Sequence, residues 1–188
     1  MIYIIDHQDS FTWNVVHQFS AFDKIYCSNY FEINQKILDQ SKIIVLSPGP
    51  GAPKDYPSTE KIYKKYKGKK KIIGICLGYQ QILHAEKGKI IQQNKIYHGY
   101  QSEVKVTNKR SIFKLNSKLK VGRYHSLKLK EPFMAKNFEI TMRCLKTNVA
   151  MAFENLKDDV YGFQFHPESF LTTNGKILIK KILQSKKS

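Results

Sequence analysis

Residues 71–85 of this chain read KIIGICLGYQQILHA. Positions 72–75 form an apolar run, as expected for a central strand that is covered on both faces. A helix is predicted to begin just after Cys76, and Gly88 lies beyond its end, where glycine commonly stops a helix. The chain therefore turns sharply at Cys76 from a buried strand into a helix, which is typical of α/β proteins.

The first half of the chain repeats this alternation of strand and helix. Short β-branched runs at residues 2–5, 42–46 and 72–75 are separated by helix-length segments, which indicates parallel strands joined by crossover helices. One such segment, residues 58–66, is predicted to be a helix capped by Ser58. The residues interpreted as the cap of the first helix are Asp9, Ser10 and Thr12.

From about residue 89 the pattern changes to closely spaced strands, which favours antiparallel pairing. A last strand and a carboxyl-terminal helix follow. We expect one domain over residues 1–188, with a mostly parallel sheet flanked by helices and an added antiparallel section. The elements predicted in this half are strands 102–107, 120–124, 138–142, 149–153 and 160–165, and a helix from about residue 174.

Length and charge limit the classes of protein to which this chain can belong. The chain has 188 residues, 41% of them hydrophobic, which suits one ordinary globular domain. Lys and Arg total 32 against 15 acidic residues, so the formal net charge is +17, but only Arg110, Arg123 and Arg143 are arginines. Because nucleic-acid readers rely on Arg for bidentate contacts, we interpret the lysines chiefly as a solvated surface. A basic nucleic-acid-binding module is the rival interpretation.

The cysteines and the amino terminus indicate a reduced compartment. Cys27, Cys76 and Cys144 stand far apart with no CxxC pair, so neither a disulfide framework nor a zinc cluster is predicted. Residues 1–6 lack the basic region of a signal peptide, and no apolar run is long enough to span a membrane. We expect a cytoplasmic protein with no membrane partner, and a frayed tail at residues 186–188.

Glycines stand two residues before and two residues after Cys76. A nucleophile on a strained strand-to-helix turn needs small residues at both positions, and Gly74 and Gly78 meet this need. The amino terminus of the following helix favours a thiolate and offers free N–H groups to an oxyanion. The alternative is a buried structural cysteine, but both glycines and the flanking elements favour a nucleophile.

A nucleophilic cysteine needs a base, and residues 162–169, GFQFHPES, offer one. His166 lies at the end of a predicted strand, and Glu168 follows two residues later. Residues i and i+2 of extended backbone project to one side, so this carboxylate can orient the imidazole. The alternative is a surface histidine beside a turn proline. Because the carboxyl ends of parallel strands gather at one edge of a sheet, we expect His166 to lie near Cys76.

Residues 47–51, SPGPG, also follow a buried strand and are expected at the same edge. Two prolines and two glycines make a rigid turn that lets backbone approach a ligand closely. Free N–H groups in this turn could complete an oxyanion hole. A plain surface turn is the alternative on this segment alone.

Four segments together resemble, in order and spacing, the class I (triad) glutamine amidotransferases. They are residues 47–51, 74–80 (GICLGYQ), 123–127 (RYHSL) and 162–169. Residues 9–14, DSFTWN, are similar to the subunits that serve chorismate enzymes: component II of anthranilate synthase or of aminodeoxychorismate (para-aminobenzoate) synthase. The FTWN part reads more like the aminodeoxychorismate branch, which we therefore prefer slightly. The same opening segment argues against an amidotransferase module of another synthetase.

The resemblance implies a flavodoxin-like sheet and an enzyme that hydrolyses L-glutamine to glutamate and ammonia, without metal or organic cofactor. It assigns Cys76 as the nucleophile, His166 as the base and Glu168 as its orienting acid. It places the oxyanion against the backbone of Gly51 and Leu77. The residues expected to hold glutamine are Gly49, Pro50, Gly51, Leu77, Gln80, Ser126 and Leu127.

One position departs from the family pattern. Tyr79 stands where these proteins usually have His, and this leaves its local role open between packing and partner signalling. His125 is interpreted as structural. Because free ammonia is protonated in water, we expect the chain to dock on a chorismate-binding component I synthase subunit, through the edge with Cys76 and the loop after Asp6.

Overall fold

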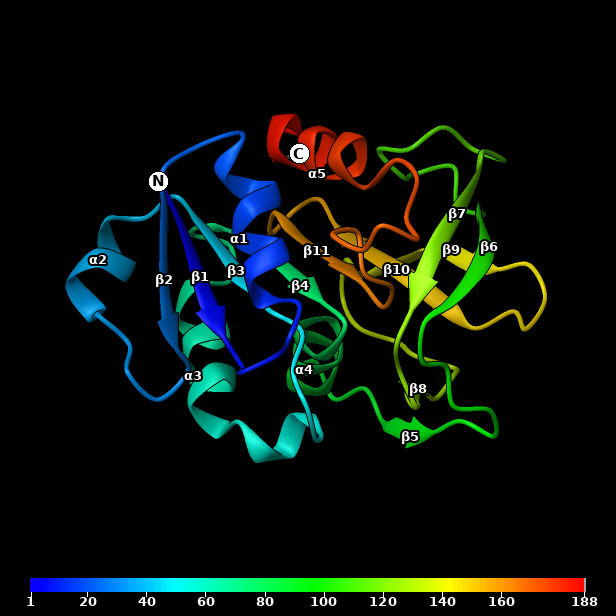
Figure 1. The fold of residues 1–188 in the computed structure, drawn as a ribbon, viewed down its shortest axis with the longest axis horizontal. Helices are drawn as coiled ribbons and strands as arrows, with labels where there is room; N and C mark the ends of the chain where they lie inside the picture. The colour runs from blue at the N-terminus through cyan, green and yellow to red at the C-terminus, as the bar shows by residue number, and fades with distance from the viewer. Residues whose placement is uncertain (188) are drawn as a thin grey trace.

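The computed structural model describes residues 1–187 and shows one nine-stranded sheet flanked by helices, with a small two-stranded sheet beside it (Figure 1). The helices are α1 (Thr12–Ser20), α2 (Gln35–Gln40), α3 (Pro57–Tyr66), α4 (Leu77–Ala85) and α5 (Gly175–Gln184), with a 3-10 turn at Pro53–Asp55. No helix within residues 1–187 has the length and apolarity needed to cross a membrane.

Five strands make the parallel half of the large sheet, in the order β2-β1-β3-β4-β11. Their chain order reverses at β1, since β2 lies on one side of it and β3 and β4 on the other. This is the doubly wound arrangement, which gathers loops at the carboxyl ends of the strands. The five strands are β1 (Ile2–Asp6), β2 (Ile25–Asn29), β3 (Ile43–Leu46), β4 (Lys71–Ile75) and β11 (Val160–Phe163).

The antiparallel section continues the same sheet in the order β11-β10-β9-β6-β7. Its strands are β10 (Ala150–Asn155), β9 (Glu139–Cys144), β6 (Tyr100–Val106) and β7 (Lys118–Arg123). The small sheet pairs β5 (Ile90–Gln92) with β8 (Leu127–Leu129). The fold class expected from the sequence, a mostly parallel sheet with an antiparallel addition, is therefore confirmed.

Hydrophobic side chains cover both faces of the sheet. On one face, Val15 and Phe19 of α1 and Ile179 of α5 belong to a core cluster with the strands. On the other, Tyr63 of α3 and Ile82 of α4 belong to a second cluster. Figure 1 shows these two pairs of helices on opposite sides of the central strands. Burial on both faces explains why β3 and β4 are apolar on successive residues.

Two predicted helix caps are wrong. Helix α3 begins at Pro57, whose fixed φ suits a first helical position, so Ser58 lies inside the first turn and the cap position belongs to Tyr56. Helix α1 has no side-chain cap: its cap position is Phe11. The polar residues before it make other bonds: Asp9 Oδ1 accepts from the Phe11 N–H (2.8 Å), and Thr12 Oγ1 donates to Asp6 Oδ1 (2.7 Å).

The last residues differ from the predicted frayed tail as far as they are described. Lys187 Nζ donates to the Gly68 carbonyl at 2.6 Å, which ties the end of the chain to the turn after α3. Ser188, the final residue of the predicted tail, lies outside the described residues.

Candidate active site

Cys76 occupies a strained turn between β4 and α4. Its φ of 51° and ψ of −98° lie in a region that non-glycine residues rarely adopt. A Cβ on Gly74 would come within 2.5 Å of the Gly78 backbone, and one on Gly78 would overlap the Leu46 carbonyl. The two glycines flanking Cys76 are therefore required by sterics, as the sequence predicted.

The backbone around Cys76 is anchored to the neighbouring strand. The Cys76 N–H donates to the carbonyl of Phe163, the last residue of β11, at 2.8 Å. Leu77 is the first residue of α4, so its N–H has no carbonyl to bind within the helix. Cys76 is buried, with 7% of its surface exposed, and it packs in the core cluster that includes α1 and α5.

His166 and Glu168 form a buried pair. His166 Nδ1 lies 2.6 Å from Glu168 Oε1, and both side chains are at most 2% exposed. The backbone of His166 is held on both sides: its N–H donates to the Gly122 carbonyl (3.0 Å), and its carbonyl accepts from Thr172 Oγ1 (2.6 Å). The imidazole thus has a fixed position and a fixed carboxylate partner.

The electrostatics of this pair include Cys76. Burial lowers the pKa of His166, but the negative charges of Glu168 and Cys76 outweigh it and hold that pKa well above the ordinary value. Because Nδ1 is occupied by Glu168, Nε2 is the nitrogen left for proton transfer, and it is buried without a hydrogen-bond partner within residues 1–187. The imidazole is therefore close to both Glu168 and Cys76, and the structure brings the three predicted triad residues together.

Two aromatic rings pack on the imidazole. Phe11 lies with its ring centre 5.1 Å from that of His166, and Tyr124 lies at 5.0 Å, both edge to face. The Tyr124 hydroxyl is 3.0 Å from Ser169 Oγ. These rings come from the loop before α1 and from the residue after β7, and they cover the imidazole with apolar surface.

The loop at residues 47–51 reaches the start of α4. A Cβ on Gly49 would approach Leu77 Cδ2 at 2.5 Å and His7 Cβ at 2.6 Å, so only glycine fits there. Gly51 has a φ of 73°, and the Pro50 carbonyl accepts from the Tyr56 hydroxyl at 2.9 Å. The structure therefore brings the predicted loop and Leu77 together.

His7 holds this loop from below, a role that sequence reasoning missed. The side chain is fully buried, and the backbone N–H of His7 donates to Ser47 Oγ at 2.9 Å. Its ring nitrogens lie 3.1 Å from Ser47 Oγ and 3.1 Å from Thr59 Oγ1. Burial lowers the pKa of His7 to about 3, so the ring is neutral and supports the loop through hydrogen bonds.

Gln80, Ser126 and Leu127 are also brought to this region. Gln80 is 3% exposed, and its Nε2 lies 3.5 Å from the Leu127 carbonyl. The Ser126 carbonyl accepts from the Gln93 N–H at 2.9 Å. Gln80 Nε2 also donates to Gln164 Oε1 at 3.1 Å, a contact that sequence reasoning did not anticipate.

The segment before Leu127 is stabilised by buried polar groups. His125 Nδ1 is 2.7 Å from the Leu127 carbonyl, and Nε2 accepts from Arg123 Nε at 3.0 Å. The Arg123 guanidinium stacks at 3.5 Å on the Tyr97 ring. Burial and the charge of Arg123 lower the pKa of His125 to about 3. His125 thus has contacts that fit the structural interpretation made from the sequence.

Tyr79 is fully buried on the core side of α4. Its hydroxyl donates to the Ala150 carbonyl (3.2 Å), and its ring packs against Phe153 at 5.3 Å. Of the two roles left open for this departure from the family pattern, these contacts favour packing.

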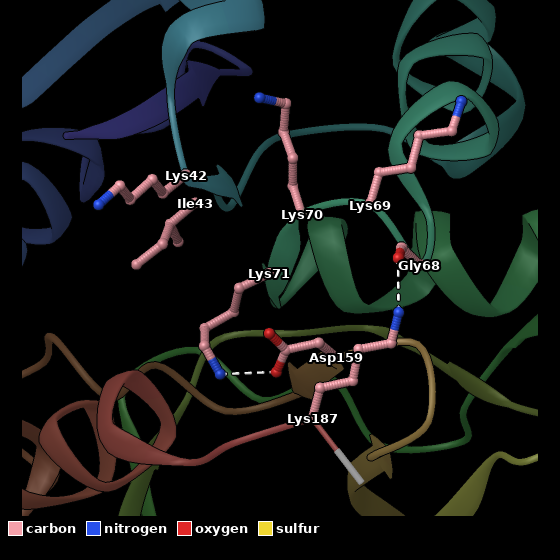
Figure 2. A pocket seen from close by; sticks show the side chains of 8 residues that line it. All are labelled: Lys42, Ile43, Gly68, Lys69, Lys70, Lys71, Asp159 and Lys187. Atoms are coloured by element: carbon pink, nitrogen blue, oxygen red, sulfur yellow. Dashed lines mark hydrogen bonds and ion pairs between the residues drawn. The ribbon is translucent and has the colours of Figure 1, made fainter.

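A lysine-rich hollow of about 360 Å³ lies near the amino-terminal ends of β3 and β4, opposite the end that carries Cys76. Figure 2 shows Lys71 bonded to Asp159 (2.6 Å) and Lys187 bonded to the Gly68 carbonyl. Lys70 donates to the Ser41 carbonyl. These three ammonium groups bind oxygen atoms of the protein itself, so they hold together segments that are distant in the sequence.

Comparison with known proteins identifies the family. Residues 3–185 match the family model described as glutamine amidotransferase class-I. The chain is 37% identical over 185 residues to a protein of Lactococcus lactis named anthranilate synthase component 2, covering 97% of this chain and 93% of that protein. It is 39% identical over 189 residues to a protein of the same name from Buchnera aphidicola, covering 97% and 94%.

Solved structures show the same fold at lower identity. A Thermoplasma acidophilum structure matches with a TM-score of 0.83 at 21% identity, covering 97% of this chain and 91% of that one. A glutamine amidotransferase from Thermotoga maritima matches with a TM-score of 0.71 at 16% identity, covering 89% and 75%. On its near full-length match to the family model, and on its identity to these relatives, the chain belongs to the class-I glutamine amidotransferases.

Proposed function

We propose that this chain is the glutaminase subunit of a chorismate-using synthase and acts as component 2 of anthranilate synthase. The proposal is supported by family membership and by relatives of that name that match over nearly their whole length. The observation that carries the chemistry is the strained elbow at Cys76 with the buried His166–Glu168 pair acting on it.

In the proposed reaction, the Cys76 thiolate attacks the carboxamide carbon of L-glutamine. The C–N bond breaks, and the His166 imidazolium gives its proton to the departing ammonia. The resulting γ-glutamyl thioester is hydrolysed by a water molecule that gives one proton to His166 and its hydroxide to the carbonyl carbon; the C–S bond breaks, glutamate is released, and the thiolate and imidazolium are restored. Glu168 keeps the imidazole in one orientation through both steps.

The oxyanion formed in each step needs hydrogen-bond donors. The Leu77 N–H at the start of α4 is one candidate, and the Gly51 N–H in the adjacent loop is the other. Gln80, Ser126 and Leu127 would hold the amino-acid end of glutamine, which the contact between Gln80 and the Leu127 carbonyl supports. Gly49 and Pro50 shape the loop against which the substrate would lie.

The proposed partner is a chorismate-binding synthase subunit that consumes the ammonia before water protonates it. Large aromatic side chains stand exposed in the segments that follow the carboxyl ends of the parallel strands: Trp13 (73%) in the first turn of α1, Phe31 (56%) and Phe170 (86%). Phe170 also lines a hollow of about 710 Å³ between α1 and the loop after His166. Exposed aromatics of this kind are typical of protein interfaces, so this edge is the proposed docking surface.

The aminodeoxychorismate role remains a second candidate, favoured in the sequence by Trp13 and its neighbours. The named relatives instead support the anthranilate role. The two roles share every residue of the proposed glutaminase site, so only the aromatic product distinguishes them.

The test is to mix the chain with each candidate synthase subunit, chorismate and glutamine, and to identify the product. We expect anthranilate with the anthranilate synthase subunit. Cys76→Ala should abolish glutamine-dependent synthesis and leave ammonia-dependent synthesis intact. Full glutamine-dependent synthesis by Cys76→Ala, or no glutamine-dependent product with either subunit, would contradict the proposal. Salt-sensitive retention on nucleic acid without glutaminase activity would favour the basic binding module instead.

A further inference from the structure

Gln164 reaches the same sulfur atom as the proposed base. Its Nε2 lies 3.8 Å from Cys76 Sγ, within hydrogen-bonding range for sulfur. The residue is fully buried, and its backbone N–H is held by the Met151 carbonyl at 2.9 Å. Gln164 and His166 alternate with Phe163 and Phe165, whose rings pack at a tilt with centroids 4.8 Å apart in the core, while Glu168 follows in a turn. The polar residues of this segment therefore share the side that faces the site.

The other end of the Gln164 amide is also occupied. Its Oε1 accepts from Gln80 Nε2 at 3.1 Å, and Gln80 Nε2 lies 3.5 Å from the Leu127 carbonyl. Because Oε1 must face the Gln80 donor, the Gln164 NH₂ group must face the sulfur. A continuous set of hydrogen bonds thus joins the Leu127 segment to Cys76 through two buried glutamines.

We infer that Gln164 is a positioning residue that holds the Cys76 thiolate by an amide N–H and couples it to Gln80 and Leu127. The part of this inference that concerns substrate at Gln80 rests on the proposed function. The contact between Gln164 and the sulfur does not depend on it. An amide donor stabilises a thiolate without being able to take its proton, so it does not compete with His166. Its fixed orientation also keeps Sγ directed at one place while the imidazole moves protons.

The coupling has a physical consequence for substrate binding. A glutamine molecule that engages Gln80 would polarise the amide of Gln164 and alter the donor presented to sulfur. Binding at the amino-acid end of the substrate would thereby reach the nucleophile through two hydrogen bonds. Loss of Gln164 should affect the reactivity of Cys76 even where no glutamine is present.

The first test measures alkylation of Cys76 by iodoacetamide as a function of pH, with the modified peptide identified by mass spectrometry. The full-length chain is compared with Gln164→Met, which removes donor and acceptor, and with Gln164→Glu, which keeps the acceptor for Gln80. Gln81→Met is the matched control, because Gln81 is also a buried glutamine and its side-chain atoms have no hydrogen-bond partner within residues 1–187.

We expect Gln164→Met to alkylate about tenfold more slowly at pH 7, with the midpoint of the pH curve raised by about one unit. Gln164→Glu should show a larger rise, since a carboxylate repels the thiolate. Gln81→Met should match the unmodified chain. Thermal unfolding of each variant identifies those that fold. One folded Gln164 variant is enough for the test. A folded variant with the unmodified rate and midpoint would overturn the inference.

The second test examines the link to Gln80 in the complex with the synthase subunit. Gln80→Met, Gln164→Met and the double variant are compared for glutamine-dependent kcat and KM. We expect Gln164→Met to lower kcat more than it raises KM, and the double variant to lose less than the product of the single losses. Strictly multiplicative losses would overturn the coupling. Because alkylation needs no turnover, it can confirm the sulfur contact even if no glutaminase activity is found.

Discussion

The backbone N–H of Cys76 donates to the carbonyl of Phe163 at 2.8 Å, so the turn after β4 is joined directly to the end of β11. Parallel pairing brings these strands together in register, with Phe163 opposite Ile75. His166 follows Phe163 by three residues and therefore reaches the thiol from the neighbouring strand. The proposed triad thus lies in the turns that directly follow one pair of neighbouring parallel strands.

Replacing Glu168 by Gln should destabilise the protonated form of His166. The negative charge of Glu168 raises the pKa of His166 against burial, so its removal lowers that pKa. The imidazolium form would then be lost at lower pH, and the alkaline limb of the kcat/KM profile should move toward neutrality. We expect kcat to fall about 10²-fold. Measured pH profiles of the complex check this, and an unmoved alkaline limb would contradict it.

Gly78→Ala should destabilise the fold through a backbone collision. The added Cβ would overlap the Leu46 carbonyl of β3, which cannot move without breaking the sheet. We expect a loss of about 3 kcal/mol in the free energy of unfolding, measured by urea titration. Gly99→Ala is the matched control, since its Cβ meets no atom closer than 3.7 Å and only its φ of 77° is unfavourable. It should cost about 1 kcal/mol, and equal losses would contradict the steric account.

Two neutral buried histidines should make the protein sensitive to acid. Burial lowers the pKa of His7 and of His125 to about 3 in the folded state, against 6.5 when unfolded. Below pH 6.5 the unfolded chain binds protons that the folded chain refuses, so stability falls until about pH 3. His166 acts in the opposite sense, because its raised pKa stabilises the fold fully below pH 6.5 and progressively less as the pH rises, so it offsets part of this loss.

The expected loss between pH 7 and pH 5 is about 2 kcal/mol for each of these histidines. Urea titrations at the two pH values measure it. His7→Gln should lower stability at pH 7 but reduce the loss on acidification by about half. An unchanged pH dependence in this variant would show that the acid sensitivity comes from elsewhere.

Trp13→Ala should weaken binding of the synthase subunit. The indole is 73% exposed at the start of α1, next to Phe11, which packs on His166. We expect the Kd of the complex to rise about tenfold or more, with the free energy of unfolding changed by less than about 0.5 kcal/mol. Met134→Ala is the control, since Met134 is 91% exposed beside the turn that ends α4. Equal effects of the two variants on Kd would place the interface elsewhere.

Local pattern predicted much of this molecule. The apolar runs that became β1, β3 and β4, the glycines around Cys76, and the two-residue spacing of His166 and Glu168 all depend on short-range geometry. The same spacing rule applies to Gln164, so its orientation toward the site was already readable in the sequence. The pattern was weaker at β2 and α2, because β2 is only half-buried and α2 has six residues.

Contacts between distant segments could not be read this way. Three such contacts join residues whose distance in space is set by the packed sheet. They are Gln80 with Gln164, His7 with Ser47 in the loop at residues 47–51, and Arg123 with the Tyr97 ring. Propensity and periodicity act over a few residues, whereas these distances follow from strand order and the close packing of both faces. Amino-acid spacing therefore established which groups face the site, and packing established which of them touch.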